Sequence, residues 1–427
     1  MTFGVNRKRL SGPGLALAAG LMMAACGGGG TGSSNQPSGP VHFDAQGSFT
    51  GVHIATGLPI LEGDKAATYV INQAGGILGH QLVMDTVDDV GDEADAVPAM
   101  NREISVNNPV FIVGLTSDEI HGVQPIFDRH HLIDGWNGGD THYDNNADKW
   151  LWRCNASDSQ LGVAVAAEAY DKGYRNAVIF MSQAASTQTL TPIIANAFKA
   201  LGGNVLGIVN IVPGQSSYRS EVQKAVSYHP DVILTQMEPS TGSVAMADFK
   251  EVDNLSIPFV GTDLTGGSDF IKAIGPSVAQ AHFVSVEGSN ALTDAGTAFV
   301  AAYKTVNGHE PLGGSAFAYD CVIDFALAIT KANSFDDNVW VNSITAVSNP
   351  PGTAVSDYKT GVDMIKAGKK INYEGASGPM DFNQFHNVNG AWDIVQSNGD
   401  AGGDTTTVRT ITADEIQTIV QKMPASS

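Results

Sequence analysis

The sequence has little positive charge, few cysteines and no apolar run long enough to cross a membrane. Its 427 residues include 23 Lys and Arg against 44 Asp and Glu, so the formal net charge is -21. This charge argues against nucleic-acid binding, because no basic patch is present to neutralise phosphates. With 43% hydrophobic and 16% charged residues, the composition is that of a globular protein, and the length allows two or three domains.

Common catalytic motifs are missing as well. The sequence has no Gly-x-Ser-x-Gly elbow, no phosphate loop with its Lys and no Cys-x-x-Cys pair. His130 and His131 are adjacent, so on a helix or strand they point apart and make a poor metal pair. We therefore expect no enzymatic activity, no cofactor and no metal site.

The first 26 residues have the features of a targeting segment. Arg7-Lys8-Arg9 supplies a positive end, and Leu15–Ala25 is an apolar core too short to span a bilayer. Met23-Ala24-Ala25-Cys26 resembles the lipobox of bacterial lipoproteins, which implies cleavage before Cys26 and a lipid on its sulfur. An ordinary secretory signal with a chance cysteine is the alternative. Residues 27–40 are almost all Gly, Ser, Thr, Asn, Gln and Pro, which predicts a flexible tether.

Beyond this segment, the chain holds two further cysteines, Cys154 and Cys321. In an oxidising compartment they could form a disulfide, and equally both could be buried thiols. The sequence leaves these alternatives open.

The stretch from Pro109 to Asn137 has the pattern of strand, polar loop, helix and strand. Val110–Val113 is typical of a buried strand, and the spacing of Thr116 and Glu119 is that of a capping box at a helix start. In a parallel sheet, loops at the carboxyl ends of the strands line the ligand crevice, and free N–H groups at a helix start suit a carboxylate. Thr116 and Ser117 are therefore candidate ligand-binding residues, with helix capping as the alternative role.

Apolar strands continue to alternate with helical stretches further along the chain. Those at residues 176–180, 204–209 and 231–234 indicate βαβ units. We therefore predict an α/β fold with mostly parallel sheets.

Motifs along this pattern resemble those of one family in their order. The family is that of the solute-binding proteins of ABC importers for branched-chain amino acids and amides, with the leucine/isoleucine/valine-binding protein as its best-known member. The motifs are Gly75–Val83, Asp88-Asp89, Gly114–Ser117, Trp152-Arg153, Ser157–Gly162, Ala200–Val205, Pro213–Tyr218, Pro230–Leu234, Phe259–Asp263, Ala318–Asp320, Gly378–Phe382 and Trp392–Gln396.

The resemblance implies two lobes, each a mostly parallel sheet flanked by helices, joined by a hinge of three crossing strands. Lobe one would comprise residues 41–152 and 281–377. Lobe two would comprise residues 153–280 and 378–427.

The resemblance also implies a binding site between the lobes. Ser117 would hold the α-carboxylate of an amino acid, and Asp263 of lobe two would receive its ammonium when the lobes close. The alternative for Asp263 is a solvated carboxylate after a strand.

Two loops depart from the family pattern. Trp136 and Asn137 stand where many relatives carry a short Ser, Thr or Ala sequence, and Trp136 is either an aromatic wall of the site or a packing anchor. Ala184–Thr187 replaces a common Tyr-Gly, so leucine itself should not be assumed as the ligand. Gln236 and Glu238 follow another strand and are further candidates for the site.

The resemblance therefore implies a monomeric, extracytoplasmic lipoprotein, anchored to the cell membrane or the outer membrane. It would capture a small amino acid, amide or related polar solute by hinge closure and deliver it to ABC permease subunits. The alternative is a ligand sensor or structural lipoprotein on the same bilobed fold. The sequence names neither the solute nor the membrane.

Overall fold

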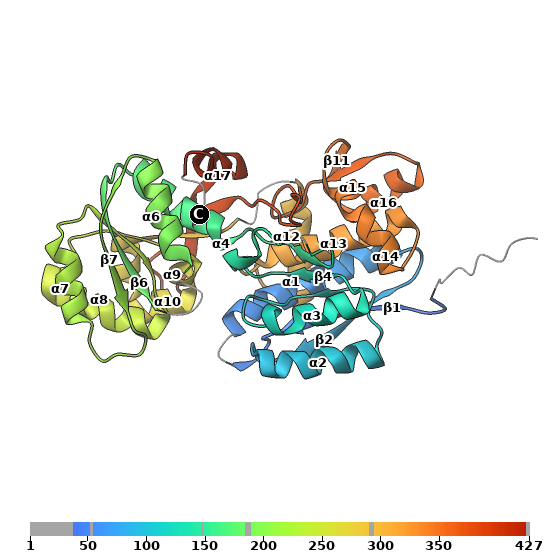
Figure 1. Cartoon of the computed structure of the whole chain (residues 1–427), viewed down its shortest axis with the longest axis horizontal. Coiled ribbons are helices and arrows are strands. Elements are labelled where there is room, and N and C mark those ends of the chain that lie inside the picture. The colour runs from blue at the N-terminus through green and yellow to red at the C-terminus, as the bar shows by residue number, and fades with distance from the viewer. Residues whose placement is uncertain (1–36, 52–53, 147, 184–188, 290–293, 424–427) are drawn as a thin grey trace, which may run out of the picture. The chain divides into compact units, whose positions relative to one another are not determined.

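The computed structural model describes residues 37–423, apart from residues 52–53, 147, 184–188 and 290–293. Residues 36–427 form one compact unit. They fold into two main sheets that are covered by helices (Figure 1), which confirms the predicted α/β class. The predicted signal segment, the predicted lipidation site Cys26 and most of the predicted tether lie outside the described residues. Among the helices that are described, none is long and apolar enough to cross a membrane.

The first sheet has five parallel strands in the order β2-β1-β3-β4-β5. With its helices we call it the five-stranded lobe. Its strands are β1 (Val41–Gly47), β2 (Leu82–Asp88), β3 (Ile112–Val113), β4 (Asp134–Trp136) and β5 (Leu151–Arg153). Its longer helices are α1 (Ile54–Gln73), α2 (Glu93–Val106), α3 (Ile120–His130), α12 (Asp294–Asn307), α13 (Ser315–Ala332) and α16 (Tyr358–Lys366).

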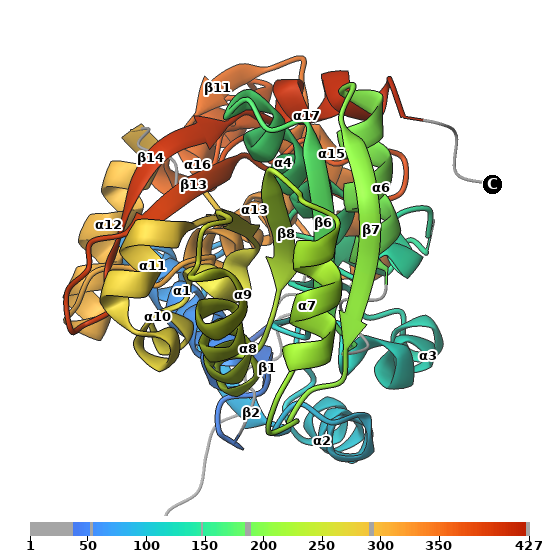
Figure 2. The ribbon, with the colours of Figure 1, turned by 90° about the vertical axis from the view of Figure 1, so that its left-hand side faces the viewer.

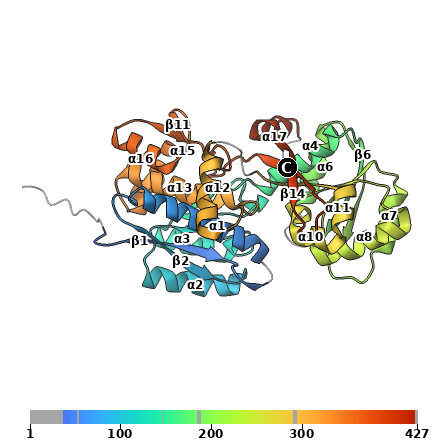
Figure 3. The ribbon, with the colours of Figure 1, turned by 180° about the vertical axis from the view of Figure 1, so that it is seen from behind.

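Shorter elements complete this lobe. They are the 3-10 helices η2 (Thr141–Tyr143) and η3 (Val341–Ser343), the helices α14 (Asp337–Trp340) and α15 (Ile344–Ser348), and the parallel pair β11 (Thr353–Val355) and β12 (Ile371–Tyr373). Helix α1 packs against α12 and α13, and α2 packs against α3 (Figure 3).

The centre of the five-stranded sheet follows the predicted apolar pattern. Phe111, Ile112 and Val113 are fully buried, although only the last two pair as β3. The ring of Phe111 lies 5.0 Å from that of Phe43 on β1 and 5.5 Å from that of Phe325 on α13. Burial of these large apolar side chains against α13 holds the sheet beneath the helix and fixes the carboxyl end of β3.

The second sheet has seven strands in the order β14-β13-β10-β9-β8-β6-β7. With its helices we call it the seven-stranded lobe. Its strands are β6 (Asn176–Ser182), β7 (Asn204–Ile211), β8 (Val232–Gln236), β9 (Phe259–Gly261), β10 (Phe283–Gly288), β13 (Trp392–Ser397) and β14 (Thr405–Ile411). Strands β13 and β14 pair antiparallel, and β13 pairs antiparallel with β10, while the other neighbours are parallel.

Two layers of helices cover this sheet (Figure 2). On one face lie α4 (Asp158–Asp171), α6 (Leu190–Ala200) and α17 (Ala413–Val420), and on the other lie α7 (Arg219–Ser227), α8 (Pro239–Asp253) and α10 (Ser268–Ile274). Two further short helices, α9 (Asp263–Gly266) and α11 (Pro276–His282), lie before β10. Alternate residues of the strands belong to the two apolar clusters, as expected for strands buried on both faces.

The chain passes between the two sheets at three places, after β5, after β10 and before β13. Two of these passages are hydrogen-bonded to each other, because the Arg153 N–H donates to the His386 carbonyl at 2.8 Å and the Val388 N–H to the Arg153 carbonyl at 3.3 Å. The Ser289 N–H donates to the Ala391 carbonyl at 3.1 Å. The sequence predicted that lobe one resumes at residue 281. Strand β10 still pairs within the seven-stranded sheet, so the chain passes back to the five-stranded lobe only after β10.

Cys154 and Cys321 form a disulfide, which resolves the alternatives left open by the sequence. Cys154 follows β5 and Cys321 lies within α13, so the bond joins the edge of the five-stranded sheet to the helix that covers it. Both residues are fully buried in the core of this lobe.

Candidate functional site

The loop between β3 and α3 carries the first two candidate residues, Thr116 and Ser117. The N–H and the hydroxyl of Thr116 both donate to Glu119 Oε2, at 2.8 and 2.5 Å. Only this half of the predicted capping box is present, because α3 begins at Ile120 and its N-cap residue, Glu119, makes no side-chain capping bond. Ser117 is half-buried, and its Oγ accepts the N–H of Asp140 at 3.1 Å. Because this contact uses a lone pair of the Ser117 hydroxyl, its hydrogen is left to donate to a ligand.

Trp136 ends β4 and is only 1% exposed. Its ring packs edge-on against Tyr143 at 5.0 Å, and the guanidinium of Arg153 lies 4.6 Å from the ring centre. These contacts favour the packing-anchor role over the aromatic wall that the sequence left as its alternative.

Asn137, the next residue, is held by its backbone. Its N–H donates to the Leu115 carbonyl at 2.8 Å, whereas both polar side-chain atoms are buried with no hydrogen-bond partner among the described residues. An unpaired buried amide is costly, so this side chain is suited to receive a ligand or a water molecule. The next position, Gly138, requires a glycine, because a Cβ there would lie 2.6 Å from the Ser117 nitrogen.

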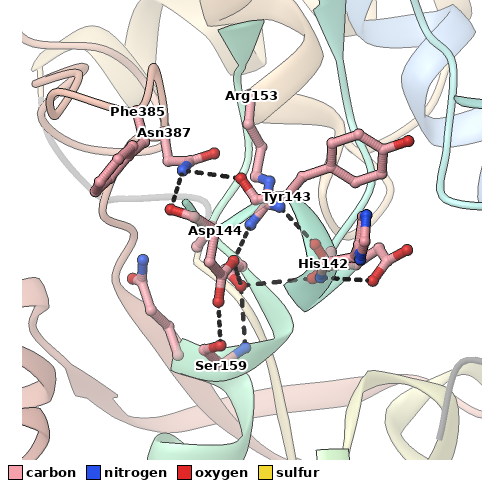
Figure 4. A network of polar contacts seen from close by, with 12 residues as sticks. His142, Tyr143, Asp144, Arg153, Ser159, Phe385 and Asn387 are labelled. Carbon is pink, nitrogen blue, oxygen red and sulfur yellow. Dashed lines mark hydrogen bonds and ion pairs between the residues drawn. The ribbon is translucent and has the colours of Figure 1, made fainter. Parts of the chain in front are cut away.

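A polar network centred on Arg153 joins this loop to the passages between the sheets (Figure 4). The buried guanidinium donates to Asp144 Oδ1 and to the Asp140 carbonyl, each at 2.6 Å. The Asp144 carboxylate also accepts the hydroxyls of Ser157 and Ser159 at the start of α4. The Asn387 side-chain amide donates to the Asp144 carbonyl at 2.9 Å, which adds the third passage to the same network. The Trp152-Arg153 motif therefore has a local structural role.

The start of α4 brings a carboxylate to the Gly138-Gly139 loop. The side chain of Ser157 caps the helix by accepting the Ser159 N–H, and the Asp158 N–H donates to the Gly139 carbonyl at 2.9 Å. A Cβ at Gly139 would overlap the Asp158 carboxylate. Burial, and next the negative charge of Asp263, raise the pKa of Asp158 to about 7.

Sequence reasoning did not single out Asp158 as a candidate. An acidic residue in the first helical turn is usually explained by the helix dipole, so it gives no special signal. One signal could have identified it: Asp158 belongs to the motif Ser157–Gly162, which directly follows the passage between the sheets that begins at Arg153.

Asp263 is the first residue of α9, directly beyond β9. The residue is exposed by surface area, yet surrounding protein atoms desolvate its carboxyl and raise the pKa. The carboxyl is therefore flanked by protein atoms and is still accessible to solvent. The Leu264 N–H donates to Asp263 Oδ1 at 3.0 Å.

Gln236 is the last residue of β8, the neighbour of β9, and Glu238 lies two residues beyond it. Gln236 is 5% exposed, and its Oε1 has no hydrogen-bond partner in the described part of the chain. Glu238 accepts the Ser182 hydroxyl at 2.8 and 2.9 Å, so its carboxylate is used within the protein.

Residues 184–187 lie outside the described residues, as does Cys26. In the described ranges, no group of three or more His, Cys, Asp or Glu is arranged to hold a metal ion.

The candidate residues thus fall into two sets. Ser117, Asn137 and Asp158 are linked through the Gly138-Gly139 loop. Gln236 and Asp263 lie at the carboxyl ends of the neighbouring strands β8 and β9. The electrostatic coupling of Asp158 to Asp263 connects the two sets.

The chain is similar in sequence to a curated protein and in fold to several solved structures. A curated relative, the Leu/Ile/Val-binding protein BraC3 of Rhizobium johnstonii, is 24% identical over 251 residues, which cover 53% of this chain and 65% of the relative. The match thus spans just under two thirds of that protein.

Several solved structures have the same fold. The leucine binding protein LivK of Thermotoga maritima has a TM-score of 0.71 at 19% identity, covering 88% of this chain and 99% of that one. The substrate-binding protein LivJ of Streptococcus pneumoniae, in complex with isoleucine, has a TM-score of 0.69 at 17% identity and coverages of 87% and 99%. A solute-binding protein of R. palustris in complex with benzoate has a TM-score of 0.67 at 17% identity and coverages of 88% and 97%.

These structures match the two-lobed architecture of the chain. The family described as periplasmic binding protein matches residues 46–404, which is most of the sequence. The chain therefore belongs to the periplasmic binding protein family.

Proposed function

We propose that the protein is an extracytoplasmic solute-binding protein that captures a small amino acid, amide or related polar solute and delivers it to an ABC permease. The observation that carries the proposal is the distribution of chemistry over the two lobes. Ser117 and the start of α3 offer donors for a carboxylate, and Asp263 on the seven-stranded lobe offers an acceptor for an ammonium group. The named ligands of the relatives, which are leucine, isoleucine, valine and benzoate, are small solutes that contain a carboxylate.

The passages between the lobes support closure around such a ligand. Arg153 and Asp144 tie the first and third passages together at the base of the Ser117 loop. A ligand that contacts both lobes stabilises the arrangement in which its two sets of partners are close, so binding and closure are thermodynamically coupled. The same scheme needs no catalytic group.

Thermal unfolding of the chain from Gln36 onwards, against a panel of amino acids, amides, urea, short peptides and aromatic acids, tests the proposal. A ligand that binds only the folded state raises the midpoint by mass action. We expect one chemical class to do so. If no member of the panel shifts the midpoint, the proposed capture of small polar solutes is wrong.

Two variants test the assignment of residues. Asp263→Ala should remove most of the affinity for a ligand with an ammonium group while the protein remains folded, and an unchanged dissociation constant would reject this role. Ser117→Ala should cost about 1 to 2 kcal/mol of binding free energy, because backbone donors remain. A large loss of folding stability in Ser117→Ala would instead indicate a structural role.

The lipid anchor is proposed from the sequence at Cys26 and has its own test. The full chain should be recovered with membranes after expression in a bacterium, whereas Cys26→Ser should not be lipidated. A variant that still fractionates with the membrane and carries the same mass after processing would exclude a lipid on this sulfur. A lipid-anchored monomer outside the cytoplasm fits the proposed role of presenting a solute to a permease.

A further inference from the structure

Three carboxylates from three elements meet at the carboxyl edge of the seven-stranded sheet. Asp263 begins α9 beyond β9, Asp158 begins α4, and Glu287 lies near the end of β10, the strand beside β9. The negative charge of Asp263 acts on both of the others. Together with burial, which is the larger cause, it raises the pKa of Glu287 to about 7, as it does for Asp158.

Glycines make room for the two flanking carboxylates. A Cβ at Gly266 would overlap Glu287 Oε1, and Gly266 lies three residues after Asp263, one turn along the same short helix. In the same way, Gly139 leaves room for the Asp158 carboxylate. Asp263 therefore acts on two carboxylates, each of which is seated against a glycine backbone.

Among the residues that the structure describes, no cation is paired with this cluster. Across the described ranges, no Lys, Arg or His forms an ion pair with Asp158, Asp263 or Glu287. Arg153 is the cation that acts on Asp158, and both of its terminal nitrogens already donate to Asp144 and to the Asp140 carbonyl. Like charges close together in a partly desolvated site repel, and a cationic partner would relieve this repulsion.

An unpaired acceptor provides a second, independent indication. Along β8, Gln236 alternates with Thr235, so it points to the same face as Val232 and Leu234, which belong to the apolar cluster beneath α4. Because α4 leads into β6, it runs back along the sheet and places its first turn at the carboxyl ends of the strands. The buried Gln236 Oε1, which has no partner among the described residues, is therefore directed towards the first turn of α4.

We propose that the solute is a cation that carries a second positive nitrogen group, such as a basic amino acid or a diamine. Asp158 and Glu287 then select for charge on either side of Asp263, and Gln236 Oε1 accepts a further N–H of the ligand. A zwitterionic amino acid would bring one positive group to three carboxylates. This inference depends on the proposed function, since it specifies the solute of the same site.

Calorimetric titration of the chain from Gln36 onwards with matched pairs of compounds tests the inference. The pairs are arginine with citrulline, lysine with norleucine, and putrescine with butylamine, so that the members of each pair differ mainly in one positive group. We expect at least one cationic member to bind tenfold or more tightly than its partner. Equal or tighter binding of the neutral amino acids, or of leucine, would overturn the cation inference and leave solute binding intact. If none of the cationic compounds binds, the inference is also wrong, and the wider panel above then decides on solute binding itself.

Charge-neutralising variants test the two flanking residues. Glu287→Gln and Asp158→Asn keep the size of each side chain, and each should lower the preference for the cationic member at least fivefold while changing the affinity for the neutral member little. Glu251→Gln, on the exposed surface of α8 in the same lobe, is the matched control and should leave the preference unchanged. A purely structural role would change the unfolding midpoint without changing the ratio of affinities. An unchanged ratio in both folded variants would reject the assignment.

Discussion

Replacing Asp44 by Asn should make the protein's stability less dependent on pH. Asp44 lies in the middle of β1 and is fully buried, and neither carboxylate oxygen has a hydrogen-bond partner in the described part of the chain. Burial is the main cause that raises its pKa from 3.8 to about 7, and the charges of Glu103 on α2 and Asp85 on β2 act in the same direction.

The sign of the effect follows from proton binding. Between pH 4 and pH 7 the folded protein keeps a proton on Asp44 that the unfolded chain has lost, so the free energy of unfolding falls as the pH rises. A raised pKa of this size corresponds to about 4 kcal/mol of unfolding free energy. The folded protein loses this stability progressively across the range and does not regain it at higher pH. Because Asn cannot ionise, Asp44→Asn should gain about this amount relative to the parent protein between pH 4 and pH 8.

Urea unfolding of both proteins at pH 4, 6 and 8, followed by circular dichroism, gives the difference in unfolding free energy. The parent protein retains other buried carboxyls with raised pKa values, such as Asp134 and Asp324, so the difference between the two proteins is the informative quantity. Asp269→Asn, at an exposed position, is the control and should give no trend. A stability difference between Asp44→Asn and the parent that does not change with pH would refute the reasoning.

Three further changes have expected outcomes. Reducing the Cys154–Cys321 bond, which spans 167 residues of sequence, should destabilise the folded state by up to about 5 kcal/mol, and urea unfolding with and without reductant measures this; identical midpoints would contradict it. Arg153→Met should lower the free energy of unfolding by about 3 to 5 kcal/mol, because it leaves the Asp144 carboxylate without its buried partner. A wild-type unfolding midpoint would disprove the role of the network. Gly139→Ala should lower the free energy of unfolding by about 1 to 3 kcal/mol, because the added methyl overlaps Asp158. Calorimetry should also show weaker ligand binding. Full affinity at unchanged stability would mean that the loop adapts freely.

The sequence was sufficient to predict the fold class, because apolar strands that alternate with helices leave few other arrangements. It also predicted the strand that leads into the Ser117 loop. The two roles of Trp136 could not be separated, because its packing depends on Tyr143 and Arg153, whose approach is a tertiary fact. The same holds for the disulfide, since the distance between two cysteines far apart in sequence is set by the completed lobe.

The sequence offered candidates for the site only where a local motif coincided with a strand end, as at Ser117 and Asp263. The candidate roles of Ser117, Asp263 and Asn137 remain predictions. The residue types of Asp158 and Glu287 give no signal by themselves, because a first-turn acid and an acidic strand residue are both usually explained by solvation. What distinguishes them is a shared position near Asp263, which comes from the pairing of β9 with β10 and from the direction of α4.

The composition of the seven-stranded sheet has a consequence for how the chain is made. Strands β6 to β10 come from the middle of the chain, whereas β13 and β14, which complete one side of the sheet, are synthesised more than a hundred residues after β10 begins. During synthesis and export, β10 would therefore wait with an open edge until β13 arrives, a state in which unpaired backbone groups invite pairing with other chains. Chaperone protection of the emerging polypeptide should matter most in this interval, and a stop codon before β13 should yield an aggregating product rather than a smaller functional protein.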